Sequence, residues 1–162
     1  MPDLTSLAQP VGELLKKRGE KIAVADSSAG GLISASLLSV PGASAYYVGG
    51  IISYTGTSRL MLLGISEEYM SEIGMRASTE GYAALIAKTV REKFGTTWAL
   101  SETGASGPTG NRYGDASGHA CIAVSGPVER TITLETGSMD REANMWSFTK
   151  AALELLEQCL KD

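Results

Sequence analysis

The sequence contains very little histidine and cysteine, and each scarcity excludes a class of protein. His119 is the only histidine among 162 residues, which excludes multi-histidine metal centres and makes any histidine-based triad depend on one residue. The two cysteines, Cys121 and Cys159, are too few for a disulfide scaffold and form no CxxC pair. We therefore expect both to be small buried apolar residues of a cytoplasmic protein.

The chain also lacks long apolar runs and an excess of positive charge. No stretch approaches the roughly 18 apolar residues that span a bilayer, and the N-terminus shows no secretory pattern. We expect no membrane partner. Fourteen Lys and Arg residues against eighteen Asp and Glu residues give a net charge of −4, with no basic stripe. This balance argues against binding to a nucleic-acid backbone.

Several common catalytic motifs are absent. The sequence contains no GxxxxGK[ST], GxGxxG, HExxH or GxSxG pattern, so phosphate-loop, dinucleotide-binding, zinc-protease and hydrolase-elbow interpretations have no support. What the chain does contain is typical of a globular protein, with 43% hydrophobic and 20% charged residues. Its length suits a single domain spanning residues 1–162.

The hydrophobic pattern predicts strands that alternate with helices and a hairpin before a last helix. Predicted helices cover residues 4–15, 32–40, 57–63, 67–73, a segment from the N-cap Ser78 to Gly95, and a segment after the N-cap Asp140. Predicted strands cover residues 21–26, 45–54, 97–101, 119–125 and 130–135. This order predicts an α/β fold, a three-layer sandwich with a mixed β-sheet and helices on both faces.

Two Gly- and Ser-rich loops are candidates for a ligand site. Residues 26–31 (DSSAGG) lie between a buried strand and a helix start, where free N–H groups can bind an anion or a developing oxyanion. The alternative is an ordinary strand-to-helix turn with a serine N-cap. The second loop, residues 103–118, is too rich in Gly, Ser and Pro for regular structure. Because ligands bind beyond the carboxyl ends of strands in α/β sheets, we expect the two loops to share one site.

At these loops the sequence resembles the CinA C-terminal domain family. The similarity runs in order through most of the chain. The matching segments are Ala25-Asp26-Ser27-Ser28-Ala29-Gly30-Gly31 (family AESCTGG), Pro41-Gly42-Ala43-Ser44 (PGSS), Gly50 to Tyr54 with Arg59 (GxxxY followed by Lys), Thr103-Gly104-Ala105-Ser106-Gly107-Pro108 ([ST]GIAGP) and Asp140-Arg141 (GDR).

The resemblance implies an amidase of nicotinamide mononucleotide, which converts a carboxamide to a carboxylate and ammonia through a Ser–Lys pair. It implies no metal or cofactor, a small nucleotide-like substrate and a homodimer. By position the nucleophile is Ser27, with Tyr54 and Thr103 orienting the site and Arg141 binding the phosphate. The turn contributes Ser28 and the backbone of Gly30 and Gly31 to substrate binding, and Gly104 belongs to the second loop.

One departure from the family pattern bears directly on catalysis. The family lysine is Arg59 here, and a guanidinium with a pKa above roughly 12 cannot act as a general base. Among other candidate bases, Asp26 is expected to point across the strand, and Tyr54 is a poor base unless its pKa is lowered. His119 is the conventional base, but the sequence favours a structural or exposed histidine there. The sequence therefore leaves open an active amidase, a paralogue that binds a pyridine nucleotide or phosphate ligand without turnover, and a structural or interaction domain.

Overall fold

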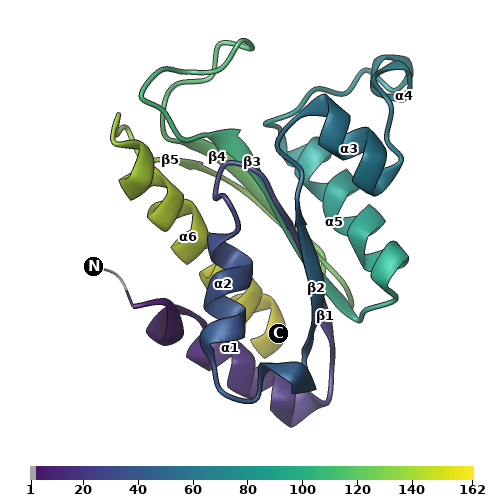
Figure 1. Ribbon diagram of the computed structural model, residues 1–162, viewed down its shortest axis with the longest axis vertical. Helices are drawn as coiled ribbons and strands as arrows, with labels where there is room; N and C mark the ends of the chain where they lie inside the picture. The colour runs from purple at the N-terminus through teal and green to yellow at the C-terminus, as the bar shows by residue number, and fades with distance from the viewer. Residues whose placement is uncertain (1–2) are drawn as a thin grey trace.

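The computed structural model, which describes residues 3–162, contains a five-stranded mixed sheet (Figure 1). The strand order is β2-β1-β3-β4-β5, with β1 parallel to both β2 and β3 and the β3-β4-β5 meander antiparallel. The mixed sheet predicted from the sequence is confirmed. The strands are β1 (Ile22–Asp26), β2 (Tyr47–Ile52), β3 (Trp98–Ala105), β4 (His119–Ser125) and β5 (Arg130–Glu135).

Helices cover both faces of this sheet, as a three-layer sandwich requires (Figure 1). One face carries α1 (Leu4–Arg18), α2 (Leu32–Ser39) and α6 (Arg141–Lys161). The other face carries α3 (Gly56–Leu63), α4 (Glu67–Glu72) and α5 (Glu80–Phe94). A short 3-10 turn, Ala43–Ala45, precedes β2, so the predicted strand 45–54 begins later than expected.

Alternation along the buried strands assigns large and small side chains to opposite faces. In β1, Ile22 and Val24 pack under α1, α2 and α6, whereas Ala23 and Ala25 face α5. Successive strand residues point to opposite faces, so a wholly buried strand serves both layers. The small residues allow α5 to lie close to the sheet.

The N-terminus of α5 differs from the sequence prediction. Thr79, and not Ser78, is the N-cap: its backbone is extended and its side chain accepts a hydrogen bond from the Tyr82 amide. Ser78 has φ 62°, a left-handed conformation that non-glycine residues seldom adopt. Its amide donates to Thr103 Oγ1 at 3.1 Å, which ties this turn to the end of β3.

Strand β3 is longer than predicted. Thr103, Gly104 and Ala105 extend it by pairing with the first residues of β4, so the irregular loop begins after Ala105. Glycine permits this pairing, because a Cβ on Gly104 would lie 2.3 Å from the carbonyl oxygen of His119. The Gly- and Ser-rich composition of residues 103–118 therefore predicted a loop, although the backbone of residues 103–105 forms a strand that requires glycine at position 104.

Two further expectations concern the cysteines and the helices. Cys121 and Cys159 are both buried and free, which confirms that neither belongs to a disulfide scaffold and that both are buried, as predicted. Among residues 3–162, no helix has both the length and the apolar character needed to cross a bilayer.

Candidate functional site

A cavity of about 540 Å³ lies where the carboxyl ends of β1, β2 and β3 meet. Parallel strands end at one edge of a sheet, so the loops after them converge there. Both loops identified in the sequence contribute to its wall. Its lining includes seven of the predicted site residues: Ser27, Ser28, Tyr54, Arg59, Thr103, Gly104 and Arg141.

Gly30 and Gly31 do not line this cavity. The Gly30 amide donates to the Ser27 carbonyl at 3.0 Å, and the Gly31 amide donates to Asp26 Oδ2 at 2.9 Å. Both N–H groups predicted to bind an oxyanion therefore already have acceptors within the turn. Gly31 also serves as the N-cap of α2, with positive φ and no side-chain cap, so the serine N-cap considered for this turn is absent.

The serine turn is held by Glu102, a residue that the sequence reasoning missed. One carboxylate oxygen of Glu102 accepts hydrogen bonds from the amides of Ser27 (3.1 Å) and Ala29 (2.8 Å). The other oxygen accepts from the Ser28 hydroxyl. Glu102 is 2% exposed, and such burial requires compensating donors. An ionisable residue directly after the predicted strand 97–101 was the available signal.

Asp26 provides a second buried carboxyl group beside Glu102. Its Oδ2 atom accepts from Gly31, whereas its Oδ1 atom has no partner. Burial, together with the nearby charge of Glu102, raises the pKa of Asp26 to about 7. Burial also raises the pKa of Glu102, although its hydrogen bonds oppose the change. Since Glu102 has more donors, the geometry favours an ionised Glu102 beside a protonated Asp26.

Arg59 lines the cavity, but its side chain is held by contacts with Ile65 and Glu67. Its Nε atom donates to the Ile65 carbonyl at 3.2 Å, and its Nη2 atom contacts Glu67 at 2.5 Å. Burial alone would lower the pKa of Arg59, but Glu67 and Tyr82 outweigh it and the pKa is raised. Arg59 is therefore a fixed cation. None of the described residues that line the cavity is a lysine or a histidine.

Arginines give the cavity an anion-binding character. Arg141, at the start of α6, donates to the Tyr54 hydroxyl at 3.1 Å and to the Gly107 carbonyl. Arg112 also lines the cavity, with its guanidinium 5.0 Å from the centre of the Tyr113 ring. Such groups bind phosphate or carboxylate oxygens through charge-assisted hydrogen bonds. Within residues 3–162, no group of three or more His, Cys, Asp or Glu side chains is placed to hold a metal ion.

Two buried hydroxyl groups in the wall lack protein partners. Ser53 Oγ and Ser106 Oγ make no hydrogen bond, and the residues are 7% and 2% exposed. Buried polar atoms without partners are rare and need an explanation. Since both residues line the cavity, a polar ligand can satisfy them. Both serines lie in segments that the sequence analysis matched to the family, residues 50–54 and 103–108, but neither was assigned a role there.

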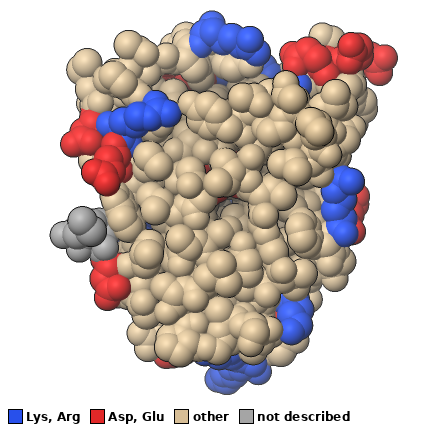
Figure 2. All heavy atoms as spheres, in the orientation of Figure 1, with Lys and Arg blue, Asp and Glu red and all other residues tan. Residues whose placement is uncertain are grey.

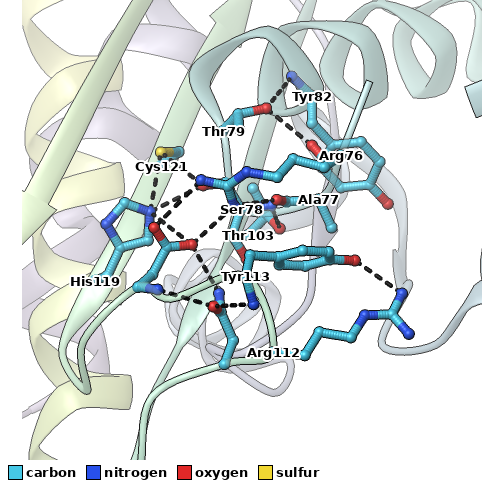
Figure 3. Close-up of polar contacts among 12 residues, drawn as sticks. Arg76, Ala77, Ser78, Thr79, Tyr82, Thr103, Arg112, Tyr113, His119 and Cys121 are labelled. Carbon is cyan, nitrogen blue, oxygen red and sulfur yellow. Dashed lines mark hydrogen bonds and ion pairs between the residues drawn. The ribbon is translucent and has the colours of Figure 1, made fainter. Parts of the chain in front are cut away.

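His119 lies outside the cavity lining and acts as a structural residue (Figure 3). Its Nε2 atom is 2.8 Å from the Ser78 carbonyl oxygen, and its Nδ1 atom contacts Glu135. Burial lowers the pKa of His119, but the bonds to Glu135 and Ser78, with Asp115 nearby, outweigh it and raise the pKa. An imidazole with an acceptor at each nitrogen is stabilised as the cation. His119 therefore has the structural role that the sequence analysis favoured, and it is not placed to replace the missing base.

Comparisons with known proteins agree with this fold. The family model "CinA C-terminal domain" matches residues 4–160. A CinA-like protein of Trichormus variabilis is 37% identical over 158 residues, covering 96% of this chain and 38% of the relative. A CinA-like protein of Chlorobium limicola is 36% identical over 154 residues, covering 92% and 35%. The chain thus spans little more than a third of these relatives.

Solved structures show the same architecture at lower identity. A CinA superfamily protein of Klebsiella pneumoniae superposes with a TM-score of 0.90 at 21% identity, covering 99% of both chains. A competence/damage-inducible protein of Agrobacterium tumefaciens gives 0.86 at 24% identity, covering 100% and 98%. At this level of identity the similarity establishes the α/β fold alone.

Proposed function

The chain belongs to the CinA C-terminal domain family, and from that premise we propose that it hydrolyses the carboxamide of a pyridine nucleotide. The products are a carboxylate and ammonia, and a serine of the Ser27–Ser28 turn is the nucleophile. The observation that carries this proposal is the composition of the cavity: serine hydroxyls from the turn share it with arginines. The family resemblance implies nicotinamide mononucleotide as the substrate.

The size and charge of the cavity support a substrate of this class. A volume of about 540 Å³ lies within the range of small-molecule sites. In the proposed pose, Arg141 and Arg112 bind the phosphate and the carboxamide lies against the serine turn. The unpartnered hydroxyls of Ser53 and Ser106 then supply hydrogen bonds to the sugar or the amide.

The chemistry requires a serine that attacks a planar amide and a group that protonates the leaving nitrogen. Attack forms a tetrahedral oxyanion, which hydrogen-bond donors must stabilise. Thr103 accepts from Ser78 through its Oγ1 atom, so its hydroxyl hydrogen is available to a ligand. Thr103 thus retains the orienting role that the resemblance gives it, whereas the amides of Gly30 and Gly31 are already occupied.

The test is to incubate the purified protein with nicotinamide mononucleotide and to measure ammonia and the acid product by mass spectrometry. We expect equimolar formation of both products, and none with the double variant Ser27→Ala/Ser28→Ala. A rate for the native protein no higher than that of the double variant would refute the amidase.

A specific observation supports a second candidate, a protein that binds a pyridine nucleotide without turnover. Arg59 occupies the family lysine position and is held by Glu67 and Ile65. The site then keeps its positive charge without the lysine base. Titration calorimetry with nicotinamide mononucleotide tests this candidate: binding without product supports it, and no heat at millimolar nucleotide contradicts it.

The family resemblance also implies a homodimer, which we propose forms across β2. The face that Figure 2 presents carries charged side chains mainly at its margins, and no charged residue occurs between Asp26 and Arg59. Edge strand β2 has β1 as its one neighbour, and exposed apolar side chains lie on and beside it. Unpaired apolar edges favour association. These side chains are Leu38, Val48, Ile52, Leu60 and Met61.

Light scattering coupled to size-exclusion chromatography tests the dimer. We expect a dimer for the native chain and a monomer for Val48→Lys, because a buried unpaired charge opposes association. Ile73→Lys, which places the same charge on another exposed apolar position, is the matched control. A native monomer, or equal behaviour of the two variants, would contradict an interface at β2.

Cytoplasmic localisation is part of the same proposal. The two cysteines are free thiols, which persist in reducing compartments. Cell fractionation followed by detection of the protein tests this point, and recovery in a membrane or secreted fraction would contradict it.

A further inference from the structure

The proposed amidase needs a base, and neither Arg59 nor His119 supplies one. The serine turn itself contains a hydroxyl–carboxylate contact, in which the Ser28 hydroxyl donates to Glu102 Oε1. Ser28 lines the cavity, whereas Glu102 is buried behind it. A serine that lines the cavity and is hydrogen-bonded to a carboxylate provides the nucleophile–base pair that covalent catalysis requires.

The two serines of the turn differ in their contacts. Ser27 uses its amide to bind Glu102 and its carbonyl to bind Gly30, and among the described contacts its hydroxyl has no carboxylate partner. Ser28 directs its hydroxyl at Glu102. We propose that Ser28, and not Ser27, is the nucleophile, and that Glu102 is its general base. This inference rests on the proposed amidase function and assigns its catalytic residues.

The position of Glu102 suits a base. The amides of Ser27 and Ala29 fix its Oε2 atom at 3.1 and 2.8 Å. Its Oε1 atom is therefore held toward Ser28, with one lone pair on the serine proton. A base whose second oxygen is anchored is oriented as in a triad, where a third group orients the base.

Burial strengthens Glu102 as a base, and its hydrogen-bond donors favour the ionised form that proton transfer needs. Burial raises the pKa of Glu102 above that of an exposed glutamate, and a stronger base accepts a serine proton more readily. The neighbouring Asp26 titrates with a pKa of about 7. When Asp26 holds its proton, the pair carries one negative charge, and the hydrogen-bond donors place that charge on Glu102.

The proton and electron balance closes with water as the one further reactant. Ser28 Oγ bonds to the amide carbon as its proton moves to Glu102 Oε1. The tetrahedral intermediate collapses, the C–N bond breaks, and Glu102 returns the proton to the departing nitrogen as ammonia. Water then attacks the Ser28 ester while one of its protons moves to Glu102. The acid leaves as that proton returns to Ser28 Oγ, and the remaining acid proton passes to the released ammonia, which gives carboxylate and ammonium.

Covalent labelling tests the assignment without a carboxamide substrate. The purified native chain is treated with a fluorophosphonate, and the modified peptide is sequenced by mass spectrometry. We expect the adduct on Ser28 and its loss in Ser28→Ala. An adduct on Ser27, or no adduct on either serine, would overturn the proposal. Failure to hydrolyse nicotinamide mononucleotide together with labelling at Ser28 would refute the proposed substrate and leave the nucleophile assignment intact.

The role of Glu102 is tested by the rate of the same labelling reaction. Glu102→Gln is expected to slow it about 100-fold or more and to abolish its rise with pH. Glu129→Gln is the matched control, because Glu129 accepts from Ser125 at an exposed position remote from the cavity. Circular dichroism and thermal unfolding must show folded variants. Ser28 labelling at the native rate in folded Glu102→Gln would overturn the assignment of the base. If Glu102→Gln is unfolded, the pH profile of native labelling decides, and a rate independent of pH overturns the base.

Discussion

The Nε2 atom of the His119 imidazole lies 2.8 Å from the carbonyl oxygen of Ser78. Within residues 3–162, Ser78 is the one residue other than glycine that has a positive φ angle. The same ring contacts Glu135 through its other nitrogen and lies 3.8 Å from Asp115. The histidine thus joins β4, β5 and the long loop to the strained turn before α5; Figure 3 shows its contact with Ser78. Strained backbone near ligand sites persists only when surrounding contacts enforce it.

Replacement of His119 by Gln is expected to destabilise the protein most at low pH. The folded-state pKa of His119 is raised, so its stabilising contribution is fully present below about pH 6.5 and is lost as pH rises through the folded-state pKa. We expect a loss of about 1.5 to 3 kcal/mol at pH 5.5 and a smaller loss at pH 8.5. Urea unfolding at both pH values measures it, and equal losses at both would contradict a charged histidine.

Replacement of Asp26 by Asn is expected to stabilise the protein at high pH. The pKa of Asp26 rises from 3.8 to about 7 on folding, so the folded state binds the proton more tightly. Its contribution is therefore fully present below about pH 4 and is lost as pH rises to about 7. At pH 8 we expect Asp26→Asn to gain up to about 4 kcal/mol, and at pH 4 to gain little. Unfolding free energies that do not diverge with pH would contradict this prediction.

Replacement of Gly104 by Ala is expected to destabilise β3 and β4. The added Cβ would meet the His119 carbonyl at 2.3 Å, and the backbone there cannot move without breaking the strand pairing. We expect a loss of about 3 kcal/mol. Gly81→Ala is the control, because its new Cβ meets the flexible end of Met75 at 3.3 Å and is expected to change stability by at most about 1 kcal/mol. Equal thermal stability of the two variants would show that the strands separate more easily than inferred.

Replacement of Arg59 by Lys tests whether Glu102 is the base or whether the site needs a lysine base at position 59. If Glu102 is the base, Arg59→Lys is expected to change the amidase rate less than about 10-fold, and any change will come from the lost contacts to Glu67 and Ile65. A working base contributes about 100-fold or more. A gain of that size in ammonia release would instead show that the native site had lost its lysine base. Glu102→Gln combined with Arg59→Lys completes the comparison.

Replacement of Arg141 by Ala is expected to weaken binding of a nucleotide but not of the nucleoside that lacks the phosphate. Charge-assisted hydrogen bonds contribute about 1.5 to 3 kcal/mol, which corresponds to roughly 10- to 150-fold in Kd. Arg130→Ala, which removes an arginine paired with Asp162, is the control. Calorimetry with both ligands measures the effect, and equal weakening for nucleotide and nucleoside would exclude a phosphate contact.

Local patterns predicted most helices and strands well. The basic last turn followed by Gly19, and Asp140 before the last helix, match the observed ends of α1 and start of α6. The errors came where distant segments decide the backbone. Thr103 to Ala105 have a loop-like composition, yet antiparallel pairing with β4 makes them part of strand β3. Ser78 has the preference of an N-cap, yet contacts with Thr103 and His119 hold it before the helix.

Periodicity and loop motifs are local properties, and from them the sequence predicted the α/β layer order, the family and seven of the residues that line the cavity. Only the tertiary structure decided which charged groups act together. Glu102 and Ser28 are 74 positions apart, and His119 and Ser78 are 41 apart, so no spacing rule links them. Whether a carboxylate or an imidazole is neutral or charged depends on its burial and partners. Those partners meet only when β1, β3 and β4 lie side by side in the folded sheet.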